Sequence, residues 1–180
     1  MRRAATAAML VLALAAGPAA ARECGEGRVG GGPTASGDAL ENFECALLAR
    51  VFCRVAEDRD AGVAAGVSIQ RTTDWLQRLN ATGSHQKANW RPFAELAARD
   101  VYRDRERKPG PLYYRTAYSC GLGKRLGDDA PAQQKAGKAF EEAADRCERE
   151  HALPGKRTYP NRALRECLAR AVDELAPVRP

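Results

Sequence analysis

The sequence predicts an all-α protein, in which about six short helices form a single disulfide-stapled bundle behind a cleaved signal peptide and a Gly-rich leader. Three observations lead to this prediction. Apolar residues recur at three- and four-residue steps along most of the chain, as on the buried face of a helix. No convincing alternating strand or Asn-Gly hairpin turn occurs. Six cysteines follow a start typical of an exported chain, so they are expected to pair.

Residues 1–21 are typical of a secretory signal peptide. Arg2 and Arg3 supply the basic start, residues 4–16 the apolar stretch, and residues 19–21 a small-residue cleavage site. The apolar stretch is too short to span a bilayer, which needs about 20 residues. We therefore expect cleavage, no membrane span in the mature chain, and a periplasmic or secreted location. The Ala-rich and Arg-rich composition indicates a bacterial source.

The mature chain divides into a leader and one domain. Residues 22–37 are so rich in glycine that neither helix nor strand is expected there, and Cys24 would tie this leader down. Residues 38–176 are then expected to form one helical domain, a length that a single core can serve.

The sequence of the first half of this domain predicts two helices. The first covers residues 38–57, with Asp38 as its N-cap and Glu41 reaching back in a capping box. A glycine-containing break follows. Ser68 is then expected to cap a second helix over residues 69–79.

Prolines and glycines set the expected bounds of the next two helices. Pro92 suits the first turn of a third helix, which should end near residue 102. The Pro-Gly-Pro segment at residues 109–111 is expected to break the chain. A short fourth helix should follow over residues 112–120, and Gly121 should end it.

Two capped helices complete the domain. Asp129 is expected to cap the fifth helix, with Pro131 in its first turn and an end near residue 150. Asn161 should cap the sixth, and Pro177 should stop it. The apolar faces of these helices are rich in Ala and poor in aromatic residues. Such a core buries limited apolar area, which favours covalent staples.

Helix geometry limits how the cysteines of the first helix pair. Cys45 and Cys53 lie eight residues apart on this predicted helix, hence about 12 Å along its axis. A disulfide needs Cα atoms within about 7 Å, so these two cannot bridge each other. Cys120 lies at the end of its predicted helix and Cys147 far along the next one, so Cys120 is expected to bond to Cys45 or Cys53, and Cys24 to whichever is left.

The last two cysteines are expected to bond to each other. Cys147 and Cys167 lie on either side of the Pro154-Gly155 connection, so an antiparallel helix hairpin would bring them face to face. Zinc sites usually contain close pairs such as C-x-x-C, and this chain has none. We therefore expect structural disulfides, with no metal ion and no cofactor.

The sequence offers little for catalysis. His85 and His151 are the only histidines, the first in a polar stretch and the second at a predicted helix end. No nucleophile elbow, P-loop or dinucleotide motif occurs. We therefore expect that the protein is not an enzyme. Paired carboxylates for glycoside hydrolysis are the alternative. The candidates are Glu41, Glu44, Glu57, Asp58, Asp60 and Asp74.

Basic residues gather between residues 99 and 125, where tyrosines interleave with them. One interpretation is a solvated helix end and loop, and the other is a surface for an acidic partner. Arg and Tyr are enriched among binding anchors. The candidate binding surface consists of Arg103, Arg105, Arg107, Tyr113, Tyr114 and Arg115.

These features predict an exported, non-catalytic binding protein of the inhibitor or immunity type, which docks onto another envelope or secreted protein. A stapled scaffold suits docking because little conformational entropy is lost. The alternatives are a periplasmic stress chaperone or envelope-structure protein, and a cryptic cell-wall hydrolase. The net charge of +6 falls to +4 in the mature chain, which lacks Arg2 and Arg3. This excess is too modest to imply a polyanion partner, and export makes a nucleic-acid partner unexpected.

Overall fold

The computed structural model describes residues 24, 42–79, 89–151 and 161–177. Within these residues it contains six α-helices and no strand, so the predicted all-α class is confirmed. The helices are α1 (Phe43–Asp60), α2 (Ala65–Leu79), α3 (Arg91–Arg103), α4 (Pro109–Leu126), α5 (Ala130–His151) and α6 (Arg162–Leu175). The predicted signal peptide and all of the predicted leader except Cys24 lie outside the described residues.

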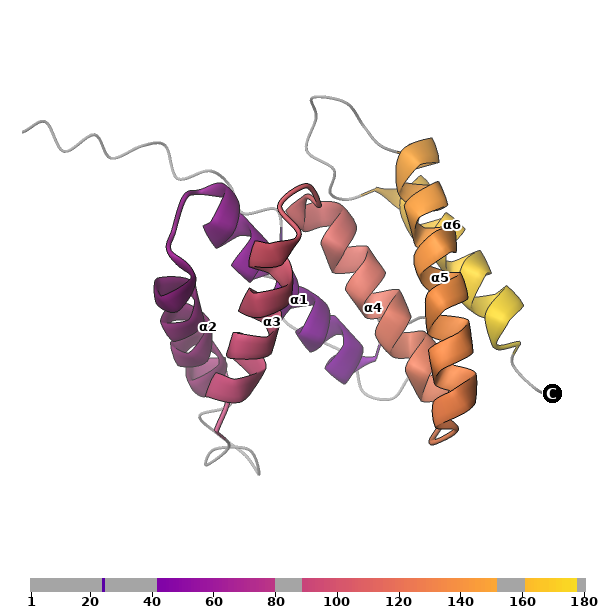
Figure 1. The fold of residues 1–180 in the computed structure, drawn as a ribbon, viewed down its shortest axis with the longest axis horizontal. Coiled ribbons are helices and arrows are strands. Elements are labelled where there is room, and N and C mark those ends of the chain that lie inside the picture. The colour runs from indigo at the N-terminus through magenta and orange to yellow at the C-terminus, as the bar shows by residue number, and fades with distance from the viewer. Residues whose placement is uncertain (1–23, 25–41, 80–88, 152–160, 178–180) are drawn as a thin grey trace, which may run out of the picture.

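The helices pack around a central pair, α1 and α4 (Figure 1). On one side of this pair, α2 and α3 contact each other and α1. On the other side, α5 and α6 contact each other and α4. The first group encloses a core that includes Val51, Val55 and Leu76, and the second encloses a core that includes Phe140 and Leu168.

The central pair belongs to both cores. Ala49 and Cys53 of α1 are buried in the core of α4, α5 and α6, while Leu112 of α4 is buried in the core of α1, α2 and α3. Small side chains on α1 let α4 approach closely, because Ala49 and Cys45 are fully buried. The two halves therefore meet along a packed seam.

The first two helices begin at other residues than predicted. Asn42 caps α1, since its Oδ1 accepts the backbone N–H groups of Glu44 at 3.1 Å and Cys45 at 3.2 Å. The predicted cap, Asp38, lies outside the described residues. α2 begins four residues early, so Ser68 is a fully buried residue of its first turn rather than its cap.

The short fourth helix predicted over residues 112–120 is wrong at both ends. Pro109 and Pro111 lie in the first turn of α4, where the N–H that proline lacks has no helical partner in any case. Gly121 lies inside the helix, at a cost of about 1 kcal/mol relative to Ala. Leu122 is almost fully buried beside it, which offsets that cost. The helix ends instead at Gly127, whose φ is +63°.

The three remaining helices agree with prediction. Pro92 lies in the first turn of α3. Asp129 caps α5, since its Oδ1 accepts the N–H of Ala132 at 3.0 Å. Asn161 caps α6 in the same way through the N–H of Leu164, also at 3.0 Å.

All six cysteines are paired. The disulfides are Cys24–Cys53, Cys45–Cys120 and Cys147–Cys167. The predicted Cys147–Cys167 bond between α5 and α6 is confirmed. Cys120 is bonded to Cys45, one of its two expected partners. Disulfides persist in oxidising compartments, so three of them indicate an extracytoplasmic protein. In the part of the chain that the structure describes, no helix is long and apolar enough to cross a bilayer.

Candidate functional site

A cleft of about 560 Å³ lies between α3 and α4. These two helices both pack on α1, while their backbones do not approach each other closely, which leaves space between them. Leu48 and Phe52 of α1 and Leu112 of α4 form an apolar wall. Thr116 and Ser119 of α4 add hydroxyl groups. The cleft can therefore receive an apolar side chain together with a hydrogen-bonding group.

Charged side chains surround the apolar wall in equal numbers of each sign. They are Asp100, Arg103 and Asp104 from α3 and its end, Arg107 from the following loop, Arg115 from α4, and Glu141 from α5. The cleft itself is therefore balanced in charge. A net attraction for an acidic or basic partner must come from side chains at its outer edge.

The candidate binding surface is divided by the structure. Arg103 and Arg105 are exposed, and Arg107 is half-buried. Tyr113, Tyr114 and Arg115 are buried, so the structure corrects the candidate surface at these three positions. Both tyrosines lie on the side of α4 that packs in the core with α5 and α6.

Arg115 instead forms the centre of an ion-pair network between α4 and α5. Its Nη1 donates to Asp145 Oδ1 at 2.5 Å and to Glu148 Oε1 at 3.0 Å, and its Nε donates to Glu141 Oε2 at 3.0 Å. Arg107 joins the network through Asp145 at 3.5 Å. A buried guanidinium needs such partners because an isolated charge is costly to bury.

The network shifts the protonation equilibria of its members. Burial alone would lower the pKa of Arg115, but its hydrogen bonds with Glu141 and Asp145 outweigh burial and raise that pKa. The hydrogen bond from Arg115 in turn lowers the pKa of Asp145. The central pair of the network therefore stays charged down to acid pH.

A second buried arginine, Arg59, fixes the loop that follows α3. Its Nη1 donates to the carbonyl oxygens of Val101 at 3.1 Å and Asp104 at 2.5 Å, and its Nη2 donates to that of Arg107 at 2.6 Å. It also pairs with Asp60 at 2.7 Å. Sequence reasoning missed this role. The available signal, a basic residue in the last turn of a helix, is shared by many solvated arginines.

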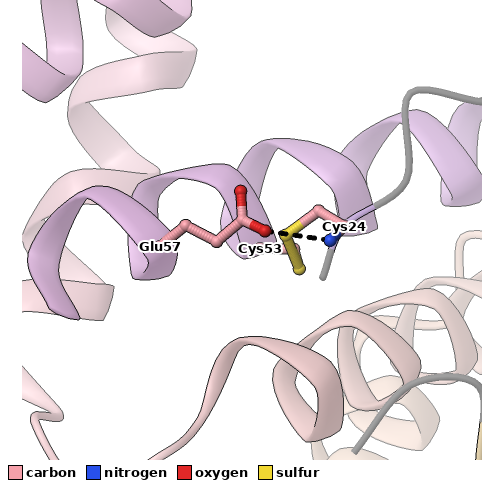
Figure 2. A group of neighbouring side chains, drawn as sticks. All are labelled: Cys24, Cys53 and Glu57. Atoms are coloured by element: carbon pink, nitrogen blue, oxygen red, sulfur yellow. Dashed lines mark hydrogen bonds between the residues drawn. A yellow bond between two sulfur atoms is a disulfide. The ribbon is translucent and has the colours of Figure 1, made fainter. Parts of the chain in front are cut away.

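One group of possible metal ligands surrounds the N-terminal disulfide. Cys24, Cys53 and Glu57 lie together on one side of α1 (Figure 2). The two sulfur atoms are bonded to each other, and Glu57 Oε1 accepts the backbone N–H of Cys24 at 3.0 Å. These contacts hold Cys24 against the helix.

A second such group lies where α5 and α6 face each other. It comprises Glu150, His151 and Cys167. Cys167 is bonded to Cys147, so its sulfur is not a thiolate in this state.

The carboxylates considered for glycoside hydrolysis do not come together in the cleft. Glu41 lies outside the described residues, and the other five are absent from the lining of the cleft. Glu44, Asp58 and Asp60 each pair with a basic side chain. The carboxylates that do line the cleft are on α3, at its end, and on α5.

Comparison of the chain with protein-family models, with curated proteins and with solved structures finds no match. Its function is therefore inferred from the geometry and charge of the cleft and its edge.

Proposed function

We propose that the protein is an exported, non-catalytic binding protein of the inhibitor or immunity type, which docks onto another protein of the bacterial envelope or the secreted fraction. The observation that supports this proposal is a basic rim, which consists of the exposed side chains of Arg103, Arg105 and Lys108. Arg103 lines the cleft, and Arg105 and Lys108 lie in the loop that also carries Asp104 and Arg107 of the cleft lining. The partner surface is accordingly acidic.

The basic side chains of the rim are available to a partner. The side chain of Arg103 is 79% exposed, and its ion pair with Asp100 is long, at 3.6 Å. Lys108 is 66% exposed and lies 3.8 Å from Asp60. Exposed pairs of this kind contribute only about 0–1 kcal/mol. A partner carboxylate can therefore replace them, and Arg103 can bind it through two parallel hydrogen bonds.

The rim is presented on a fixed frame. Arg59 holds the backbone at Asp104 and Arg107, on both sides of Arg105. The Cys45–Cys120 disulfide fixes the two helices beneath the cleft. Since these groups are ordered before binding, docking costs little conformational entropy. A rigid basic rim beside an apolar cleft suits an acidic surface with one projecting apolar side chain.

The test begins with the oxidised mature chain as bait in envelope and secreted fractions, followed by calorimetry with the purified partner. We expect a complex of fixed one-to-one stoichiometry whose affinity falls as ionic strength rises. The R103E/R105E variant should lose at least about 100-fold in affinity without a change in melting temperature, because rim charges are exposed. The matched control is R162E/R170E, which changes two exposed arginines of α6. Equal affinity of both variants would contradict the placement of the site.

A second candidate is a stress chaperone or envelope-structure protein. It is favoured by four large apolar side chains that are 41–48% exposed: Phe43, Val67, Leu79 and Leu96. Exposed apolar surface of this kind can hold unfolded clients. This function predicts suppression of client aggregation without a fixed stoichiometry. A saturable one-to-one complex that depends on Arg103 and Arg105 would argue against it.

A further inference from the structure

The facing ends of α5 and α6 gather four groups that can bind a metal ion. Glu150 and His151 end α5, and Cys167 faces them from α6. A carboxylate oxygen, an imidazole nitrogen and Sγ from these three residues lie within 4.8 Å of one another. The fourth group is Cys147, which is bonded to Cys167. It precedes His151 by four residues on α5, so the two share a helix face.

This set of atoms has the chemistry of a zinc site. Zinc in structural sites prefers a tetrahedron of thiolates and imidazoles, with carboxylate also accepted. Zn–S and Zn–N bonds of about 2.3 Å and 2.0 Å place ligand atoms about 3.5 Å apart. The ligand atoms therefore have to approach one another by at most about 1.3 Å, which side-chain rotation can supply. Glu150 is exposed, and His151 and Cys167 are only half-buried.

We propose that Cys147, His151, Glu150 and Cys167 form a zinc site that opens when the disulfide is reduced. A dithiol reductant passes two electrons and two protons to the Cys147–Cys167 bond and becomes a disulfide itself, which leaves two cysteine thiols. Zinc binding then releases both thiol protons to solvent and forms two Zn–S bonds. Cys167 is half-buried rather than fully buried, which favours access of the reductant to the bond.

The site exchanges one cross-link between α5 and α6 for another. In the oxidised protein a covalent bond joins the helices, and in the reduced protein a zinc ion joins the same side chains. Metal binding that requires the folded arrangement of ligands stabilises that arrangement. This inference is independent of the proposed docking function, since the rim and these four residues lie on different helices.

The first test titrates Co²⁺ into the mature protein, oxidised or reduced without air by a phosphine, which leaves no competing thiol. We expect only the reduced protein to bind Co²⁺ with the absorption bands of tetrahedral, thiolate-bound cobalt, and Zn²⁺ to displace the cobalt. His151→Ala should weaken binding at least about tenfold. His85→Ala removes the chain's other histidine and should change nothing.

Reduction also opens the other disulfides, so a second test keeps them closed. Cys147→Ser, purified without reductant, frees the Cys167 thiol beside His151 and Glu150 while the other four cysteines can stay paired. We expect this variant to bind one Co²⁺ without reductant, and C147S/H151A to bind at least about tenfold more weakly. Binding no tighter than that of the oxidised native chain, or unaffected by the loss of His151, would overturn the proposal.

Discussion

Arg115 connects α4 to α5 through a guanidinium that is 4% exposed. Its three partner carboxylates come from successive turns of one face of α5, at positions 141, 145 and 148. If the guanidinium is removed, Glu141 loses its basic partner in this network, and Asp145 and Glu148 keep only their longer contacts with Arg107. The cost of removing one partner of a buried pair exceeds the net contribution of the pair itself.

We predict that Arg115→Met lowers the free energy of unfolding by about 2–3 kcal/mol, because the charge-assisted hydrogen bonds are lost while apolar packing is retained. The cost stays below that of a fully buried pair, since Asp145 and Glu141 are about half exposed. Urea unfolding of the oxidised protein measures it. Arg162→Met is the control, because its ion pair is exposed and should change stability by less than about 0.5 kcal/mol. Equal losses in the two variants would contradict the assigned role.

The same network predicts how stability depends on pH. The pKa of Asp145 is lower in the folded protein than its unfolded value of about 3.9. Its contribution is therefore complete above that value and is lost as pH falls through the folded pKa. We expect the stability difference between the native chain and Asp145→Asn to shrink below about pH 4. Unfolding measured between neutral pH and pH 2 tests this, and a difference that is constant with pH would contradict it.

The order of residues 113–115 explains why the candidate surface was partly wrong. Tyr, Tyr and Arg are typical of binding surfaces, and the sequence does not show which side of α4 faces α5 and α6. The carboxylates that pair with Arg115 lie more than 25 residues away in the chain. Only the packing of α5 against α4 shows that this arginine is buried.

At the scale of elements, the loop between α3 and α4 depends on the end of α1. Arg59 satisfies three backbone carbonyl groups of the loop and of the end of α3. Carbonyl groups at the end of a helix have no partner within the helix, so an outside donor stabilises them. The position of the basic rim therefore depends on a residue that lies outside it.

We predict that Arg59→Met loosens this loop and lowers stability by about 2 kcal/mol, the scale of lost charge-assisted hydrogen bonds. Hydrogen exchange at residues 104–108 and trypsin cleavage after Arg105 should both become faster. Affinity for the partner should also fall. Arg71→Met is the control, because Arg71 is 58% exposed and its contact with Asp58 is long, at 3.5 Å. Unchanged exchange at the loop would contradict the assigned role of Arg59.

Helix periodicity and capping residues predicted most elements but not the length of α4. Asp129 and Asn161 have short polar side chains that accept hydrogen bonds from N–H groups three residues further along the chain. Their capping role can therefore be predicted from the local sequence. Gly121 favours a helix end by its intrinsic preference. It lies within α4 because the tertiary contacts of Leu122 outweigh that preference, and those contacts come from distant helices.

For the whole molecule, the Cys45–Cys120 disulfide is the covalent link between the two central helices. It joins α1 to α4 across the seam where the two cores meet, and it closes the longest loop. The sequence limited the expected partners of Cys120 to Cys45 and Cys53, because Cys120 lies at the end of its predicted helix and Cys147 far along the next one. The sequence could not predict the cleft, which exists because α3 and α4 both pack on α1 and their backbones do not approach each other closely.

We predict that replacing both cysteines of each pair by serine costs most for Cys45–Cys120. Loop-closure entropy gives about 4.5 kcal/mol for a separation of 75 residues, against about 3.6 for 29 residues and about 3.3 for 20. Chemical denaturation of the three double variants measures the order. A larger loss for Cys147–Cys167 than for Cys45–Cys120 would contradict this ranking.

In sequence order, Cys45 lies between Cys24 and Cys53, which are bonded to each other, and Cys45 is bonded to Cys120, 75 residues further along the chain. During synthesis Cys24 and Cys45 emerge first, so an oxidase that joined cysteines in order of arrival would make a bond that the native protein lacks. Correct pairing requires Cys53 and then Cys120 to become available. Any early Cys24–Cys45 bond must be exchanged by a disulfide isomerase or by a free cysteine of the chain. The yield of protein with the native disulfides should therefore depend on isomerase activity in the compartment where the chain is oxidised.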